Sequence, residues 1–450
     1  MTGFEGADGE AAGKAADETA RRGGIENDDD NAYTEGAPKR GRPRLRFPRR
    51  PSRSSTRTPV EVRPPEVLGG DPDEAEAVAE RIRTPGGFAA GMSALGAATL
   101  GSVGTLMPGR RASDPWAGDD MDELGVDRGS MVAATDGVPL AVREAGPTDA
   151  PMTVVFVHGY TLTMDTWHFQ RRHLADRFGS EIRMVFYDQR GHGLSGKSSI
   201  ENSTIDQLAR DLSTVISATA PTGPVVVIGH SMGGMTVMGY AVRHPEAVRD
   251  RVMGVGLVAT AMAELSESGL GSVLDSKAMA RVAALINRSP GVFTSGRKAL
   301  GAIISPFIYG GSFGDPASMS PTVARFVDKT INSTDVLTIA NFFETLTQHD
   351  ESEAMPILRN VRTTVLCGDR DLLTPLDRSV DIVEELPDAE FVVVPGSGHM
   401  VMLEEPAHVS EVLGDLVADA IVEWRERERL AEAGGGRRDA SAADRSAKAS

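Results

Sequence analysis

The sequence predicts an α/β fold: a mostly parallel, doubly wound β-sheet with helices on both faces and a helical cap insertion. From about residue 129 onward, short apolar runs rich in β-branched residues alternate with segments of helical periodicity. This alternation is typical of a parallel sheet covered on both sides. About 100 residues separate the runs that end at Val258 and begin at Thr363, which is far too many for a plain crossover and indicates an inserted unit.

The sheet is expected to begin with an antiparallel hairpin at its edge. Residues 131–135 and 140–143 flank Asp136-Gly137, a dipeptide typical of tight turns between strands. Parallel strands are then expected at residues 153–157, 182–187, 225–228, 252–258, 363–367 and 391–394. The cap is expected over about residues 262–350, with helices at 277–287, 320–331 and 333–348. Such a cap would exclude water and shape a substrate pocket.

The parts outside this domain differ in composition. Residues 1–85 are acidic at first and then rich in arginine and proline, without apolar periodicity, so we expect them to be disordered. Residues 86–120 form an uncharged Gly/Ala-rich segment and a linker, and the catalytic domain is expected over 121–430. Residues 431–450 are small and polar, which predicts a disordered tail.

Residues 86–107 carry no charge over 22 positions, a length that can span a membrane. Six of them are glycine and most of the others are small, so the driving force for insertion is weak. Three interpretations stay open: a membrane-associated helix, a helix docked on the domain, and a flexible linker. The segment begins too far from Met1 for an ordinary signal peptide, so we expect a cytoplasmic protein with this segment as its candidate membrane attachment.

The charge balance argues against general nucleic-acid binding. The net charge is −17, whereas affinity for phosphates needs clustered lysine and arginine. The arginines of residues 38–65 could touch anionic lipid or nucleic acid, but we interpret them as a solvated extension. The only cysteine, Cys367, excludes an internal disulfide and lies in a predicted buried strand, so no oxidising compartment is required.

The most informative motif is Gly-x-Ser-x-Gly around Ser231. It follows the apolar run 225–228 directly and precedes a helix-compatible segment, which would place the serine hydroxyl at the tip of a sharp turn. A serine hydroxyl needs a base, and the base needs an orienting acid. Asp371 and His399 follow the next two predicted strands in the chain order Ser, Asp, His.

From about residue 129 to 423 the chain resembles the α/β-hydrolases, in the broad group of esterases, lactonases, monoacylglycerol lipases and cofactor-free haloperoxidases. The resemblance is carried by His158-Gly159-Tyr160, Asp188-Gln189-Arg190-Gly191-His192-Gly193, Gly229-His230-Ser231-Met232-Gly233, Gly368-Asp369-Arg370-Asp371 with Pro375, and Gly398-His399. It implies that Ser231 is the nucleophile, His399 the base and Asp371 the acid. Asp369 competes for the last role, and the family spacing Gly-x-x-Asp-x-x-x-Pro favours Asp371.

The resemblance also implies an oxyanion hole made by the backbone N–H groups of Tyr160 and Met232. Asp188 and Arg190 are interpreted as braces of the loop after their strand, and His192 as structural. The sequence contains no metal-binding motif, and we expect neither a metal nor an organic cofactor.

These residues predict a serine hydrolase that cleaves carboxylic esters or similar acyl compounds through an acyl-enzyme. We expect its partner to be a small-molecule acyl substrate of apolar character. In an epoxide hydrolase of this fold, the resemblance implies that position 231 would be Asp. In a proline-releasing peptidase, the turn around the serine would usually read Gly-Gly-Ser-Trp-Gly, which this sequence lacks. The alternatives left open are haloperoxidase-like perhydrolysis or peptidase activity on the same triad, and a non-catalytic binding protein on the same scaffold. The sequence defines neither the particular substrate nor the oligomeric state.

Overall fold

The structure is a computed structural model that describes residues 66–67, 114–263, 265 and 310–447. In this part of the chain, nine strands form one sheet in the order β1-β9-β8-β7-β6-β4-β5-β3-β2. The strands are β1 (Glu66–Val67), β2 (Arg128–Ala133), β3 (Pro139–Ala145), β4 (Met152–Val157), β5 (Ile182–Tyr187), β6 (Val225–His230), β7 (Val252–Val258), β8 (Thr363–Gly368) and β9 (Glu390–Val394).

All eight predicted strands are confirmed, as are the antiparallel hairpin at the edge and the mostly parallel sheet. β2 pairs antiparallel with β3, and β3 antiparallel with β5, whereas β4 to β9 pair with one another in parallel. The central strands are buried along their whole length because helices cover both faces. The two-residue strand β1 pairs with β9 and was not expected, because residues 1–85 lack the periodicity from which a strand can be predicted.

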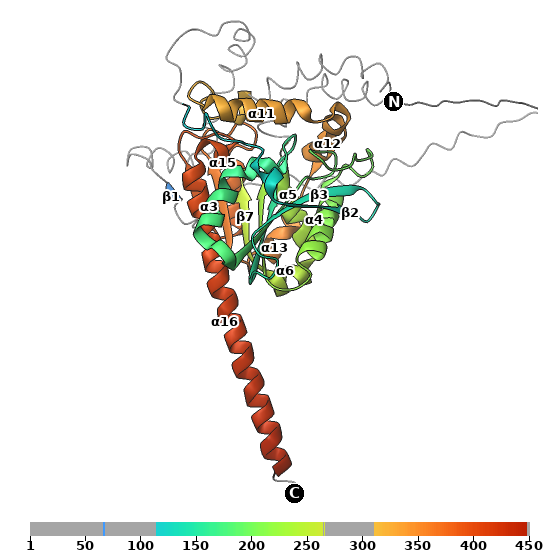
Figure 1. Cartoon of the computed structure of the whole chain (residues 1–450), viewed down its shortest axis with the longest axis vertical. Helices are drawn as coiled ribbons and strands as arrows, with labels where there is room; N and C mark the ends of the chain where they lie inside the picture. The colour runs from blue at the N-terminus through green and yellow to red at the C-terminus, as the bar shows by residue number, and fades with distance from the viewer. Residues whose placement is uncertain (1–65, 68–113, 264, 266–309, 448–450) are drawn as a thin grey trace, which may run out of the picture. The chain divides into compact units, whose positions relative to one another are not determined.

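Helices pack on the two faces of the sheet and enclose two apolar cores (Figure 1). The helices are α3 (His168–Phe178), α4 (Ile205–Thr219), α5 (Met232–Arg243), α6 (Pro245–Arg251), α11 (Pro321–Ser333), α12 (Val336–Gln348), α13 (Met355–Leu358), α14 (Leu376–Glu385), α15 (Val401–Glu404) and α16 (Pro406–Ala447), with short 3₁₀ helices η1 (Glu123–Val126), η2 (Met164–Trp167), η3 (Gly179–Glu181) and η5 (Ser352–Ala354). α3 and α16 contribute to one core and α4, α5, α6 and α14 to the other. Alternate residues of β4 enter each core: Val154 and Phe156 the first, Val155 and Val157 the second.

The insertion after β7 contains two described helices, α11 and α12, which confirm the helices predicted at 320–331 and 333–348. The start of each is fixed by an N-cap: Ser320 Oγ accepts from the Val323 N–H, and the Asp335 side chain from the Leu337 N–H. The helix predicted at 277–287 lies outside the described residues.

The folded domain begins before the predicted boundary at residue 121. We call residues 114–127 the N-terminal strap, because they connect α11 of the insertion with α3 of the core. The Asp114 carboxylate accepts from Ser320 Oγ at 2.6 Å and Thr322 Oγ1 at 2.9 Å, at the first turn of α11. The ring of Trp116 lies 4.6 Å from that of Phe169 on α3. The sequence missed this packing because the strap has few apolar residues and no periodicity.

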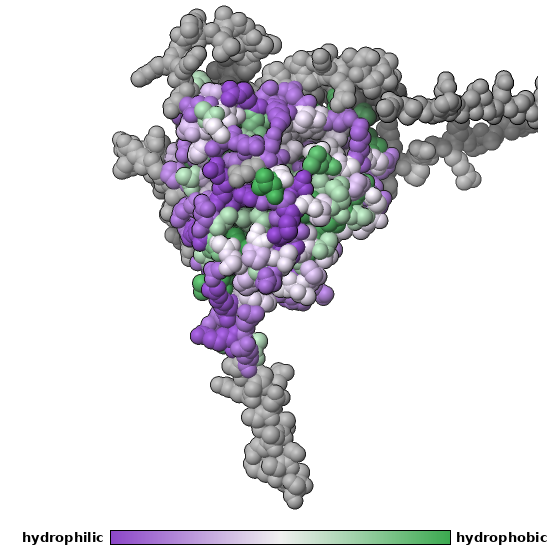
Figure 2. Space-filling view, viewed as in Figure 1, coloured by the Kyte–Doolittle hydropathy of each residue, from purple (hydrophilic) through white to green (hydrophobic). Residues whose placement is uncertain are grey.

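Helix α16 is longer than the sequence predicts. Its first part packs against α3, and the helix continues to Ala447, whereas a disordered tail was expected from residue 431. Ion pairs one turn apart, Arg427–Glu423 and Arg429–Glu426, stabilise the helix where it leaves the domain. Alanine and charged residues with high helix propensity follow, which explains the continuation despite three glycines. Figure 2 shows that α16 is mostly hydrophilic where it leaves the domain.

The uncharged segment at 86–107 lies outside the described residues, so its three interpretations stay predictions. Among the helices that the structure does describe, none combines the length and the apolar character needed to cross a membrane. The predicted burial of the single cysteine is confirmed: Cys367 lies in β8 with none of its surface exposed, and burial raises the pKa of its thiol to about 12.

The strap should contribute to stability. A fragment of residues 113–450 should melt about 2–6 °C above a fragment of residues 121–450, because only the longer one keeps the contacts of Asp114 and Trp116. Differential scanning calorimetry of the two fragments measures this difference. Equal melting temperatures would contradict a structural role for residues 114–120.

Candidate active site

Ser231 lies at the sharp turn between β6 and α5. Its φ of 53° and ψ of −122° are unusual for a residue other than glycine. Hydrogen bonds hold the turn on both sides: the Ser231 N–H donates to the Val258 carbonyl at 3.0 Å, and Thr260 Oγ1 donates to the Ser231 carbonyl at 2.8 Å. Within the described residues, the other non-glycine positive φ angles are at Thr161 and Ala259, in loops beside this turn. Strained backbone of this kind clusters at functional sites.

Two glycines allow this turn to pack closely. A Cβ on Gly229 would lie 2.4 Å from the Gly233 carbonyl oxygen, and a Cβ on Gly233 would lie 2.2 Å from the Val157 carbonyl oxygen. Real Cβ atoms do not approach this closely, so both positions require glycine. The packing brings the end of β4 and the loop after it against Ser231.

His399 and Asp371 meet as the sequence spacing implies. His399 Nδ1 lies 2.8 Å from Asp371 Oδ2, and both side chains are almost fully buried. The carboxylate also accepts from the N–H groups of Leu373 and Thr374 and from Thr374 Oγ1. These bonds orient the carboxylate toward the ring. The other candidate acid, Asp369, accepts instead from the Gly396 N–H at 2.7 Å.

The backbone of His399 is held by the residue that precedes Ser231. His230 Nε2 lies 2.9 Å from the His399 carbonyl oxygen, and the two rings are 4.8 Å apart. Burial and the nearby His399 keep the pKa of His230 well below its usual range, so its ring is neutral and Nε2–H donates to that carbonyl.

The loop after β4 faces Ser231. A Cβ on Gly159 would lie 3.1 Å from the Ser231 Cβ, which places the Gly159-Tyr160 peptide beside the serine. Met232 begins α5, so its N–H belongs to the first turn and has no partner within the helix. The N–H groups predicted to form an oxyanion hole therefore belong to segments that flank Ser231. The Tyr160 hydroxyl donates to the Ile339 carbonyl at 2.5 Å and connects this loop to α12.

His158 holds the loop from inside the domain. Its Nδ1 lies 2.7 Å from the Gly159 carbonyl oxygen, and its Nε2 accepts from the Gln189 N–H at 2.9 Å. The side chain is fully buried, and burial lowers its pKa to about 3. A neutral ring with its proton on Nδ1 satisfies both contacts.

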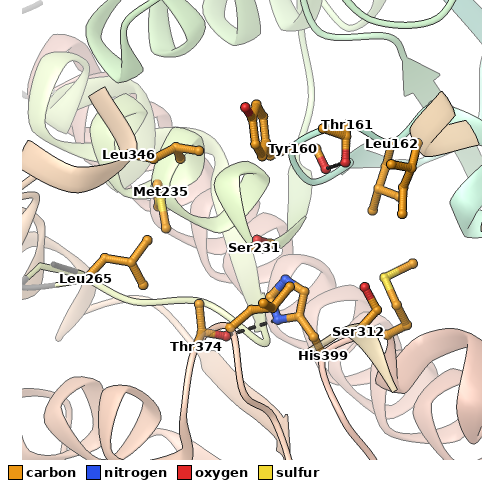
Figure 3. Close-up of a pocket in the computed structure, with 13 residues that line it drawn as sticks. Tyr160, Thr161, Leu162, Ser231, Met235, Leu265, Ser312, Leu346, Thr374 and His399 are labelled. Carbon is orange, nitrogen blue, oxygen red and sulfur yellow. Dashed lines mark hydrogen bonds between the residues drawn. The ribbon is translucent and has the colours of Figure 1, made fainter. Parts of the chain in front are cut away.

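Ser231 and His399 line the same cavity, which encloses about 510 Å³ including its open mouth (Figure 3). Most of its other walls are apolar. They come from the oxyanion loop, from α5, from the insertion and from the loops of Asp371 and His399: Tyr160, Thr161, Leu162, Met235, Leu265, Ser312, Ile331, Leu346, Leu373, Thr374 and Met400. Asp371 lies behind His399 and does not line the cavity.

The remaining motif residues brace the structure, as predicted. The Asp188 carboxylate accepts from the N–H groups of Met164 and Leu194, and Arg190 pairs with Asp211 and Asp136. His192 is buried beside these residues, with Nδ1 3.0 Å from the Arg190 carbonyl oxygen.

Several wall residues could not be predicted from the sequence. Met235 follows Ser231 by four positions, a helical spacing that is more often that of a core residue, yet this side chain lines the cavity. Ser312 and Leu265 lie far from the motifs in the chain, so no local pattern indicated them. Among the described residues, no group of three or more His, Cys, Asp or Glu side chains is arranged to hold a metal ion.

A family model described as the alpha/beta hydrolase fold matches residues 153–406, a range that contains Ser231, Asp371 and His399. The chain belongs to the α/β-hydrolase family. The match covers more than half of the sequence and all the parallel strands from β4 to β9.

Curated relatives of this α/β-hydrolase include a lipase and a haloperoxidase. A monoacylglycerol lipase of Mycolicibacterium smegmatis is 27% identical over 287 residues, which are 62% of this chain and 89% of the lipase. A non-heme haloperoxidase of Rhodococcus erythropolis is 27% identical over 273 residues, 60% of this chain and 92% of that enzyme. A solved esterase of Thermogutta terrifontis superposes with a TM-score of 0.52 at 23% identity and covers 65% of this chain and 99% of its own. This last likeness concerns the fold alone.

The close packing at the Ser231 turn predicts that one added methyl group strongly lowers the stability of the protein. Gly233→Ala should lower the free energy of unfolding by about 2 kcal/mol or more, because its Cβ would overlap the Val157 and His158 carbonyl oxygens. Gly118→Ala is the control, since nothing lies within 4 Å of its added Cβ. Urea denaturation measures the free energy of unfolding of both variants. A Gly233→Ala variant as stable as the control would contradict this description of the turn.

Proposed function

We propose that this α/β-hydrolase is a serine hydrolase that cleaves carboxylic esters or similar acyl compounds through an acyl-enzyme. The observation that carries the proposal is the presence of Ser231 and His399 in one cavity, with Asp371 hydrogen-bonded to the far side of the His399 ring. A nucleophile, a base and an orienting acid in this relation are what acyl transfer needs.

In the proposed reaction, Ser231 Oγ attacks the carbonyl carbon of the substrate while His399 Nε2 takes the hydroxyl proton. Asp371 holds the proton on His399 Nδ1, which leaves Nε2 free to act as the base, and stabilises the imidazolium that forms. His399 then protonates the leaving alcohol. A water molecule, activated by the same ring, attacks the acyl-enzyme and releases the acid.

The negative charge that develops on the carbonyl oxygen would be received by the N–H groups of Tyr160 and Met232. Both are backbone donors held in place before the substrate binds, by the His158 contacts and by the start of α5. Donors that need no reorganisation stabilise the oxyanion most effectively.

The walls of the cavity support an apolar acyl or alcohol group. Seven of the thirteen lining residues are leucine, isoleucine or methionine. Among the aromatic residues of the expected cap, Phe293, Phe307 and Tyr309 lie outside the described residues. Phe342 is buried in an apolar cluster that α12 forms with residues of α4 and α5, including Met232 and Met235. A series of p-nitrophenyl esters of increasing acyl length would define the preferred chain length.

Substitution of the nucleophile tests the proposal directly. Ser231→Ala should reduce ester hydrolysis by roughly three orders of magnitude or more and abolish labelling by a fluorophosphonate probe, with the fold intact. Ser199→Ala, on an exposed loop, should label and react like the native protein. A native protein that neither labels nor cleaves esters would favour the non-catalytic scaffold.

Substitution of the two candidate acids, Asp371 and Asp369, should affect kcat to very different extents. Asp371→Asn should lower kcat by about 10³–10⁴, because the amide no longer holds the required tautomer of His399. Asp369→Asn should keep kcat within about tenfold, because that carboxylate binds the Gly396 N–H instead. Steady-state kinetics on one soluble ester compare them. The reverse order of effects would assign the acid to Asp369.

Perhydrolysis is the second candidate, favoured by the similarity to the non-heme haloperoxidase. In this reaction hydrogen peroxide replaces water in the attack on the same acyl-enzyme, and a peracid leaves in place of the acid. Peroxide-dependent oxidation of a halide, present in the native protein and absent in Ser231→Ala, would support it.

A further inference from the structure

A half-buried carboxylate outside the predicted triad joins the His399 loop to the insertion. Glu404, at the end of α15, follows His399 by five positions. Its Oε1 accepts from the Gly398 N–H at 2.8 Å, and its Oε2 accepts from the Gly314 N–H at 2.8 Å. One side chain therefore fixes both the residue before His399 and the last stretch of the insertion before α11.

The two segments that Glu404 joins lie backbone to backbone. A Cβ on Gly398 would lie 2.5 Å from the Gly314 nitrogen, and a Cβ on Gly314 would lie 2.0 Å from the Gly396 carbonyl oxygen. The Met400 N–H donates to the Ser312 carbonyl at 2.8 Å. Since Ser312 and His399 both line the cavity, a shift of one segment would move the base and the wall together.

We infer that Glu404 is a positioning residue for His399, a carboxylate clamp that sets the base against the insertion through the N–H groups of Gly398 and Gly314. This inference rests on the proposed function, because it assigns Glu404 a role only if His399 is the base. A displacement of about 1 Å in a catalytic group can lower a rate by about 10²-fold, so two hydrogen bonds at this place can control kcat.

The clamp depends on the ionised form of the carboxylate, which offers acceptors to both N–H groups. Burial is the main cause that raises the pKa of Glu404, to about 7, and the two N–H groups oppose it. Asp371, from the loop after β8, and the adjacent Glu405 raise it further. As the pH falls through about 7, Glu404 takes up a proton, and the oxygen that carries it then places an O–H against one of the two N–H donors. The clamp should therefore loosen on the acid side of neutrality.

Glu404→Gln tests the clamp at nearly constant shape. The amide keeps one acceptor and places an NH₂ group against the other N–H. We therefore expect kcat at pH 8 to fall about tenfold and KM to change less. The concentration of active sites, to which kcat refers, is titrated with a fluorophosphonate. Glu405→Gln is the matched control: this exposed neighbour pairs with His408, and kcat should stay within about twofold. If kcat per titrated site is the same in Glu404→Gln as in the native protein, the inference is overturned. Absence of labelling in the native protein would instead overturn the proposed function.

The pH dependence of the variant against the native protein gives a second test. Because Glu404 loosens the clamp when it takes up a proton, native kcat should exceed that of Glu404→Gln by about tenfold at pH 8, and this ratio should approach one as the pH falls below about 7. The two proteins share every other ionisable group of the site, so the ratio isolates the contribution of residue 404. A ratio that stays constant from about pH 8 to 5, with circular dichroism unchanged over this range, would contradict the clamp.

Discussion

The approach of α5 to the end of β4 is the constraint on which the site depends. Gly233 lies so close to the Val157 and His158 carbonyl oxygens that even one methyl group does not fit. This contact bends the chain sharply at Ser231, directs the serine toward the cavity and brings the Gly159-Tyr160 peptide beside it. The geometry of the candidate site thus follows from packing between main-chain atoms, which few side-chain changes elsewhere can alter.

Most of the sheet could be predicted because its signal is local. Each buried strand is a short apolar run between turn residues, and each motif follows the strand that presents it. Ser231, Asp371 and His399 were assigned from motifs at strand ends and from the resemblance to the α/β-hydrolases, and the structure brings the last two within 2.8 Å. Asp369 and Asp371 lie only two positions apart, and the family spacing favoured Asp371. In the structure the Asp371 carboxylate bonds to His399, whereas the Asp369 carboxylate bonds to the Gly396 N–H.

Features that depend on long-range contacts could not be predicted. Asp114 accepts hydrogen bonds from the first turn of a helix about 200 residues away in sequence, and Trp116 packs on α3, although nothing in the strap itself has a periodic pattern. Glu404 has its two N–H partners in segments 6 and 90 residues away. Met235 lines the cavity only because α12 and Leu265 cover that side of α5. Local composition carries none of this information.

The burial of Cys367 has a practical consequence for the study of this enzyme. The chain contains a single thiol, and that thiol is fully enclosed in β8, with its pKa raised to about 12. Only thiolates react readily with maleimides or spin labels, so the native protein should remain unmodified at neutral pH. A cysteine introduced on α11 or α12 would then be the one reactive site, and a fluorophore or nitroxide there could report on the insertion during turnover without a cysteine-free background.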